Sequence, residues 1–246
     1  MNEFLTTDAC KLKLNKKSVD LVITHPPYLG IDTGRYGGKK EKQINYKNNE
    51  KLMLWKLVKA TQRMEKALKD EGSIFICLGG NQSLPHKYIA MVLKHTKLQF
   101  SGFIYWDYEK KESVEYERLN GQQSLWLHFI RGNVPPYFND KVPLRNWYSN
   151  VVNNMQEAID VELTEENNFV GDAYPIGIAH RLIQMFSPEN ATVLDPFGGS
   201  GITAQSALEN GRSFITNDIS LDATELAKKR IDLYLSSPED YGTLST

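Results

Sequence analysis

The stretch VLDPFGGSGIT, residues 193–203, joins an apolar segment to a glycine-rich turn and places Asp195 between them. Glycine allows positive φ and a close approach of ligand to backbone, and free amides at the start of the next helix favour electron-rich groups. Asp218 lies twenty residues after Gly198, at the end of the next apolar segment. Nucleotide-binding folds place there a carboxylate that accepts hydrogen bonds from both ribose hydroxyls. These residues predict a site for a cofactor that contains a nucleoside.

Two known glycine-rich motifs, the phosphate-binding loop and the dinucleotide fingerprint, match this stretch poorly. No Lys-Ser or Lys-Thr pair follows Gly201, as a phosphate-binding loop requires, and the spacing differs from the dinucleotide fingerprint. A turn that serves tight packing alone is the remaining alternative, which the placement of Asp218 makes weaker.

A second turn, THPPY at residues 24–28, follows the apolar run 19–24. Proline has no N–H and pushes the preceding residue out of the α region, so this segment continues neither a helix nor a strand ladder. His25 and Tyr28 are therefore expected on a stiff loop. A neutral imidazole accepts a hydrogen bond through one ring nitrogen, whereas an imidazolium accepts none. The alternative is an ordinary turn that ends a strand.

Strand and helix patterns alternate around these two turns. Strands are expected at 19–24, 73–80, 100–108, 124–130, 191–195 and 213–220, and helices at 52–68, 85–96, 178–186, 202–211 and 221–235. This order predicts an α/β fold with a mostly parallel sheet and helices on both faces.

The two turns resemble the motifs of a known family. DPFGGSGIT is similar to the S-adenosylmethionine motif DPFxGSGTT of DNA methyltransferases that modify exocyclic amino groups, and THPPY resembles their catalytic motif. The catalytic motif comes first and the cofactor motif last, which is the β arrangement. The opening segment is also similar, with Thr7 where glycine is usual, whereas Tyr174 stands where the family commonly has histidine.

The resemblance implies a Rossmann-like, S-adenosylmethionine-dependent methyltransferase fold over nearly the whole chain. It divides the chain into a catalytic half at 1–108, a small target-recognition insertion at 109–168 and a cofactor-binding half at 169–246. The residues that it assigns to the cofactor S-adenosyl-L-methionine are Asp8, Asp195, Phe197, Gly198, Gly199, Ser200, Gly201 and Asp218.

The resemblance also implies a reaction, the methylation of the exocyclic amino nitrogen of a base flipped out of DNA. Its catalytic residues are expected to be His25, Pro26, Pro27 and Tyr28, with Tyr28 as the surface on which the base stacks. The family usually has aspartate or asparagine at position 25 for adenine, and often serine for cytosine. The T-x-PPY context favours N4 of cytosine slightly over N6 of adenine, and transfer is expected to fall as His25 becomes protonated.

Basic and aromatic residues interleave in the insertion and in the loop after THPPY, a mixture that suits phosphate contacts and stacking on double-stranded DNA. The basic residues expected at DNA are Arg35, Lys39, Lys40, Lys110, Lys111, Arg118 and Arg145. Arg131 has the same pattern, and for any one of these residues a packed or solvated surface role is an equal alternative. Two further alternatives are a non-catalytic nucleic-acid-binding subunit, because His25 is unusual, and a methyltransferase that acts on RNA.

Composition sets the remaining expectations. With 29 basic and 30 acidic residues, a uniformly basic coat is excluded, although a basic face is not. The two cysteines have no metal-ligand spacing, so no metal site is expected and a reduced, cytoplasmic protein is the default. No apolar stretch reaches the roughly twenty residues of a membrane span. A homodimer or a helper subunit would suit the short insertion, and the presence of a cognate restriction enzyme is left open by the sequence.

Overall fold

The computed structural model describes residues 2–27, 49–78, 84–107, 123–132, 134–142, 147–148, 151–153 and 174–236. In chain order its elements are β1 (Glu3–Thr6), η1 (Ala9–Lys11), β2 (Val19–Thr24), α1 (Glu50–Ala67), β3 (Leu68–Leu78), α2 (Leu84–His95), β4 (Leu98–Asp107), β5 (Gln123–Arg131), β6 (Trp147–Tyr148), β7 (Val151–Asn153), α3 (Ile176–Phe186), β8 (Thr192–Asp195), α4 (Ile202–Glu209), β9 (Ser213–Asp218) and α5 (Leu221–Ser236). Among these described elements, no helix is long and apolar enough to cross a lipid bilayer.

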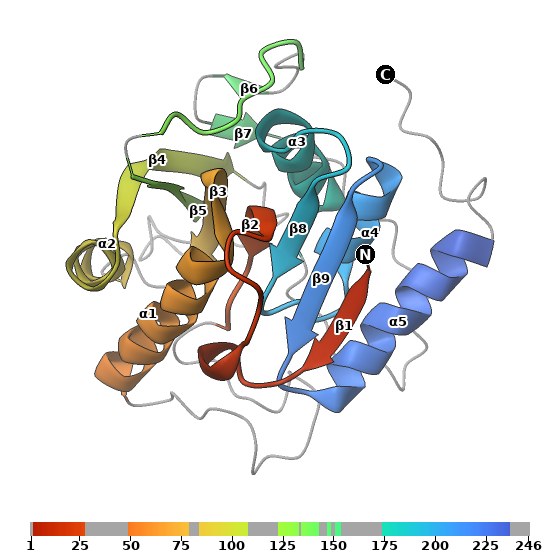
Figure 1. Cartoon of the computed structure of the whole chain (residues 1–246), viewed down its shortest axis with the longest axis horizontal. Helices are drawn as coiled ribbons and strands as arrows, with labels where there is room; N and C mark the ends of the chain where they lie inside the picture. Colours follow the sequence, from red (N-terminus) through yellow and green to blue (C-terminus); the bar gives the residue numbers. More distant parts are fainter. Residues whose placement is uncertain are drawn as a thin grey trace, which may run out of the picture.

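One mixed sheet organises the described strands in the order β1-β9-β8-β2-β3-β5-β4-β7-β6 (Figure 1). The run from β1 through β9, β8 and β2 to β3 is parallel throughout. β5 lies antiparallel between β3 and β4. The expected α/β fold with a mostly parallel sheet is confirmed.

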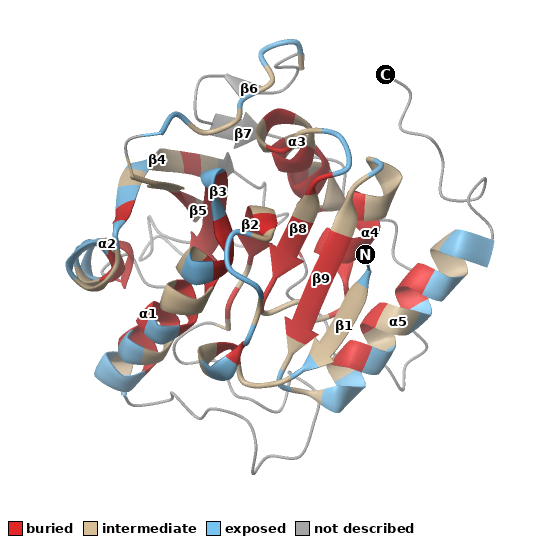
Figure 2. Ribbon diagram, viewed as in Figure 1, coloured by how far each residue is buried: buried red, intermediate tan, exposed pale blue. Residues whose placement is uncertain are grey.

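Helices cover both faces of the sheet because the central strands alternate their apolar side chains between two cores. In β2, Val22 packs into the core under α1 and α2, while Leu21 and Ile23 pack into the core under α3 and α4. Strands β2, β8 and β9 are buried on both sides, whereas the outer faces of the helices are exposed (Figure 2). Continuous apolar strands are typical of a parallel sheet that is covered twice.

The strand expected at 124–130 is present as β5, and its position is informative. It lies in the middle of the sheet, and the residues Trp126, Leu127 and Phe129 are fully buried. These residues fall within the range 109–168 that the resemblance assigns to a recognition insertion. The range 109–168 therefore includes a central strand of the sheet, and a recognition insertion within this range stays a prediction.

The side chain of Arg131, at the end of β5, is partly buried and bound to other residues of the protein. Its guanidinium donates to the carbonyl oxygens of Glu65 and Leu68 and lies 3.3 Å from the carboxylate of Asp70. These contacts tie the end of α1 to the sheet, so Arg131 is not a free cation for DNA.

The start of β3 differs from the expected pattern. The helix is expected at 52–68 and the next strand at 73–80, but α1 ends at Ala67 and the strand begins directly at Leu68. Two of the charged residues at the start of the strand have partners: Lys69 pairs with Asp20 at 2.8 Å, and Asp70 pairs with Lys17 at 2.6 Å. The short strand β1 was not expected at all.

Candidate active site

Three neighbouring parallel strands bring the two sequence motifs to one edge of the sheet. Strands β9, β8 and β2 lie side by side (Figure 1), and their carboxyl ends carry Asp218, Asp195 and Thr24. The chain leaves β8 toward β9 but leaves β2 toward β3, so the connections diverge between β8 and β2. Such a topological switch point is where open α/β sheets bind their ligands.

Asp195 joins the two turns through its carboxylate. It is 3% exposed, and its Oδ1 accepts the Thr24 hydroxyl at 2.7 Å and the Phe197 N–H at 3.1 Å. The Thr203 hydroxyl donates to Oδ2. Burial raises the pKa of Asp195 to about 6, and the three hydrogen bonds oppose that rise. Thr24, the residue before His25, is thus hydrogen-bonded directly to Asp195, the first residue of the glycine-rich turn.

The glycines of the turn have different reasons to be glycine. A Cβ on Gly198 would lie 1.9 Å from Oγ1 of Thr216, and one on Gly201, which has φ +85°, would lie 2.9 Å from Cβ of Ala227. Both positions allow the turn to pack on its neighbours. Gly199 has φ +48°, and a Cβ there would meet no protein atom within 4 Å. The turn therefore presents bare backbone toward open space, as the close approach of a cofactor requires.

Asp218 lies beside that open backbone. Its Oδ2 accepts the Gly199 N–H at 3.1 Å and its Oδ1 accepts the Ser220 N–H at 2.9 Å. Burial raises the pKa of Asp218, while these amide hydrogen bonds lower it. Each carboxylate oxygen keeps a lone pair, so the group can still accept the two hydroxyls of a ribose. These residues fit the nucleoside end of S-adenosylmethionine.

Asp8 reaches the same edge because β1 pairs with β9 up to Thr6 and Asp218. Its Oδ1 accepts the Cys10 N–H at 2.9 Å and caps the short helix η1. Asn217 holds this segment to the turn, since its Nδ2 donates to the carbonyl oxygens of Thr7 and Pro196 at 3.0 Å each. The contact of Asp8 with a cofactor stays a prediction.

His25 is partly exposed at the end of β2, and Pro26 after it is buried. Its ring lies 6.0 Å from the Tyr174 ring at an interplanar angle of 85° and 6.4 Å from the Trp126 ring at 30°. The residue expected to stack on the base, Tyr28, lies outside the described residues. So do all seven basic residues expected at DNA, Arg35, Lys39, Lys40, Lys110, Lys111, Arg118 and Arg145.

Several residues of this edge were not found from the sequence. Thr203 and Thr24 lie inside the quoted motifs, but nothing in their spacing shows that they share Asp195. Arg230 is 7% exposed on α5; its Nε donates to the Ser200 carbonyl at 2.7 Å and its Nη1 to Oε1 of Gln205 at 3.2 Å. This guanidinium supports the turn from behind, and only an arginine among helical lysines hints at it in the sequence.

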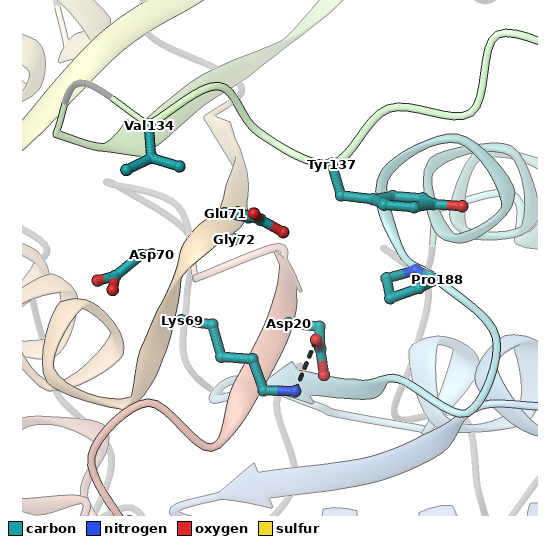
Figure 3. A pocket seen from close by; sticks show the side chains of 8 residues that line it. All are labelled: Asp20, Lys69, Asp70, Glu71, Gly72, Val134, Tyr137 and Pro188. Atoms are coloured by element: carbon teal, nitrogen blue, oxygen red, sulfur yellow. Dashed lines mark hydrogen bonds and ion pairs between the residues drawn. The ribbon is translucent and has the colours of Figure 1, made fainter.

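A separate hollow lies at the opposite end of the sheet, where β2 and β3 begin (Figure 3). Its lining includes Asp20 and Lys69, which form an ion pair, together with Tyr137 and Pro188. It shares no residue with the two turns. Within the described part of the chain, no three His, Cys, Asp or Glu side chains gather as metal ligands.

Comparisons with known proteins agree with this geometry. The family model N6_N4_Mtase, described as DNA methylase, matches residues 19–229. The type II methyltransferase M.HpaI of Haemophilus parainfluenzae is 28% identical over 235 residues, which covers 89% of this chain and 70% of that protein. The DNA adenine methyltransferase YhdJ of Escherichia coli is 23% identical over 251 residues, covering 90% and 79%.

Solved structures share the fold. The cytosine-N4-specific PvuII DNA methyltransferase superposes with a TM-score of 0.73 at 17% identity, covering 96% of this chain and 92% of its own. The complex of M1.HpyAVI with S-adenosylmethionine superposes with a TM-score of 0.70 at 19% identity, covering 94% and 100%. The family match spans the turn after β2 and the turn after β8 together. The chain therefore belongs to the DNA methylase family of N6 and N4 amino-methyltransferases, whose methyl donor is S-adenosyl-L-methionine.

Proposed function

We propose that this protein transfers a methyl group from S-adenosylmethionine to the exocyclic amino nitrogen of a base in double-stranded DNA, with N4 of cytosine as its target. The observation that carries the proposal is the 2.7 Å hydrogen bond from Thr24 to Asp195. It joins the residue before His25 to the start of the glycine turn, so a base beside His25 lies next to a cofactor held by that turn.

The chain's own residues hold and orient the two reactants. The cofactor supplies an electrophilic methyl group on a sulfonium. Asp218 is placed to accept the ribose hydroxyls, and Gly199 leaves room for the cofactor against the backbone. Holding both reactants in line converts a bimolecular transfer into one within a complex, which is a large part of the rate enhancement available.

His25 would act on the amino group itself. The lone pair of an exocyclic amino nitrogen is delocalised into the base ring, and an acceptor aimed at an amino hydrogen helps to localise it on nitrogen. A neutral imidazole provides such an acceptor. The rigid Pro26–Pro27 pair fixes the backbone that follows, so the ring is presented from a stiff loop.

The choice of cytosine rests on the T-x-PPY context, which resembles the cytosine subgroup of the family. The similar proteins include both an adenine methyltransferase and a cytosine-N4-specific one, so they support the shared reaction and leave the base to experiment.

The experiment combines labelled transfer with nucleoside analysis. The protein is incubated with methyl-labelled cofactor and plasmid DNA, and the nucleosides are separated by mass spectrometry. We expect 4-methylcytosine, and a loss of about a hundredfold or more in rate for His25→Ala, because an acceptor for the reacting amino group is removed. His25→Asn keeps an acceptor and should retain more activity. The matched control is His86→Ala, an exposed histidine on α2.

Three results would overturn parts of this proposal. N6-methyladenine in the product would reject cytosine and keep the reaction. Cofactor binding without transfer would reject an enzyme in favour of a binding subunit. Transfer to RNA alone would reject DNA as the substrate.

A further inference from the structure

A chain of hydrogen bonds runs away from the Asp195 carboxylate on the side opposite Thr24. The Tyr174 hydroxyl lies 2.6 Å from Oγ1 of Thr203, and the Thr203 hydroxyl donates to Oδ2 of Asp195. All four residues are 5% exposed or less. They come from three distant parts of the chain: the end of β2, the end of β8 with the first turn of α4, and the residues before α3.

The chemistry of the groups fixes the direction of this chain. An ionised carboxylate only accepts hydrogen bonds, so the single proton of Thr203 is used on Asp195. The Thr203 oxygen then accepts the proton of Tyr174. Burial and the nearby Asp195 charge raise the pKa of Tyr174 well above its ordinary value, which keeps the phenol a donor. These hydrogen bonds hold the Tyr174 ring at its hydroxyl end.

The other side of that ring faces His25. The Tyr174 and His25 rings meet edge to face, with centroids 6.0 Å apart, and the Tyr174 and Trp126 rings do the same at 5.0 Å. The Trp126 ring lies at only 30° to the His25 ring and is fully buried on β5, in the middle of the sheet. His25 thus lies beside two aromatic rings that also contact each other, and both of these rings are buried in the core. Aromatic pairs at these separations have preferred geometries.

We propose that Tyr174 is a positioning residue that sets the orientation of the His25 ring, and that the hydrogen bonds through Thr203 to Asp195 hold Tyr174 in place for this task. The proposal rests on the proposed catalytic role of His25. The backbone around His25 is fixed by Thr24 and Pro26, so the orientation of the imidazole depends on its side-chain torsions and on the rings that contact it. A hydrogen bond to an amino group depends on that rotation, because such bonds weaken steeply as they bend.

The first test removes one oxygen atom. Tyr174→Phe keeps the ring and deletes the hydroxyl, and Thr203→Val keeps the shape of Thr203 and deletes the next link. We expect each to lower kcat about tenfold, since misplacement of a catalytic group by less than 1 Å has effects of this order. The dissociation constant for S-adenosylmethionine and KM for DNA should stay within about twofold. The double variant should lose no more than either single variant, because both break the same chain.

The fold supplies a matched control. Tyr88 and Thr61 form another buried tyrosine–threonine pair, between α2 and α1 in the opposite core. Tyr88→Phe removes the same kind of hydroxyl from an equally buried site without touching His25. We expect it to leave kcat unchanged, and an equal loss of kcat in Tyr88→Phe and Tyr174→Phe would overturn the proposal, because the effect would then be general destabilisation.

The second test separates this proposal from the proposed function. In a His25→Ala background, Tyr174→Phe should cost nothing further, since there is no imidazole to orient. An equal loss in both backgrounds would overturn the positioning role and leave the catalytic role of His25 intact. No loss from Tyr174→Phe in the wild-type background, at unchanged stability, would do the same. Full transfer by His25→Ala alone would instead remove the proposed function on which this inference rests.

Discussion

At the scale of single residues, two glycines of the same turn are glycine for opposite reasons. Gly198 must lack a side chain because Thr216 already occupies the place of its Cβ, whereas Gly199 faces open space. A motif read from the sequence treats both as ligand-binding positions. The structure divides them into one that packs and one that leaves room for a ligand.

Gly198→Ala is expected to lower the free energy of unfolding by roughly 1–3 kcal/mol, the usual cost of forcing an extra methyl group into a packed site. The obstructing atom is Oγ1 of Thr216, which lies 1.9 Å from the position that the alanine Cβ would take. The substitution should therefore cost much less when Thr216 is already alanine. Urea unfolding of both single variants and the double variant measures this coupling.

Gly199→Ala provides the comparison within the same turn. Its cost comes from φ +48° and not from a clash, so it should be about 1 kcal/mol with or without Thr216→Ala. If Gly198→Ala cost the same in both Thr216 backgrounds, the close packing of the turn on β9 would be wrong.

At the scale of elements, the pairing of β3 with β5 buries a titratable group in the sheet. The His128 ring stacks on Phe75 with centroids 4.3 Å apart, and its Nε2 lies 3.0 Å from Oγ of Ser73. Burial lowers the pKa of His128 from 6.5 to about 4. The folded protein keeps this ring neutral in a pH range where the unfolded chain protonates it.

His128 should therefore make stability depend on pH between about 6.5 and 4. The stabilisation is fully present above pH 6.5 and is lost as the pH falls toward 4, by roughly 3 kcal/mol in total, because the unfolded chain binds the extra proton there. Asp195 has the opposite effect in nearly the same range, since its raised pKa makes the folded state hold the proton. The pH profile of wild-type stability alone would therefore combine the effects of His128 and Asp195.

The difference between the wild type and His128→Gln isolates the histidine. Glutamine does not titrate, so the stability of the wild type relative to the variant should decline as the pH is lowered through this range. His86→Gln, on the exposed face of α2, is the matched control for the loss of a histidine. Denaturant unfolding at half-unit pH steps gives the profile, and a flat difference curve would show that His128 is already free to protonate in the folded state.

Local sequence patterns predicted most helices and strands because the spacing of apolar residues within each segment indicates its secondary structure. The helices around Leu57 and Ile183 show apolar spacing of 3–4 residues, and the buried strands are continuous apolar runs. The pattern at 124–130 predicted a strand but could not place it, because its pairing with β3 depends on residues about fifty positions away. Likewise, the sequence predicted both turns, but not that Thr24 and Asp195, 171 positions apart, would share a hydrogen bond.

At the scale of the whole molecule, the sheet has two ends with different character. The carboxyl ends of β9, β8 and β2 carry the glycine turn, Asp218 and His25. The amino ends of β2 and β3 border the hollow of Figure 3, whose lining includes the Asp20–Lys69 ion pair and Asp70, which pairs with Lys17. Of the two ends, the first combines a topological switch point with the bare backbone at Gly199.

Amide hydrogen exchange distinguishes the two ends directly. The amides of Phe197, Gly199 and Ser220 donate to the carboxylates of Asp195 and Asp218, whereas the Tyr137 amide donates to the Glu71 carbonyl at 2.9 Å beside the hollow. S-adenosylmethionine should slow exchange at the first three and leave Tyr137 unchanged, since exchange through local opening responds only where the ligand holds the structure closed.

The concentration of cofactor decides how clearly this contrast appears. At a hundredfold excess over its dissociation constant, a ligand adds about 2.7 kcal/mol to global stability, which would slow every amide that exchanges only by global unfolding. The comparison therefore uses amides that exchange by local opening, and Asp218→Asn serves as the control because it removes a charge beside the ribose position while leaving the hollow intact. Protection that appeared at Tyr137 and not at Gly199 would place the cofactor away from the switch point and reject the arrangement of the site. Protection at Gly199 that survived Asp218→Asn undiminished would reject only the role of Asp218 in holding the cofactor.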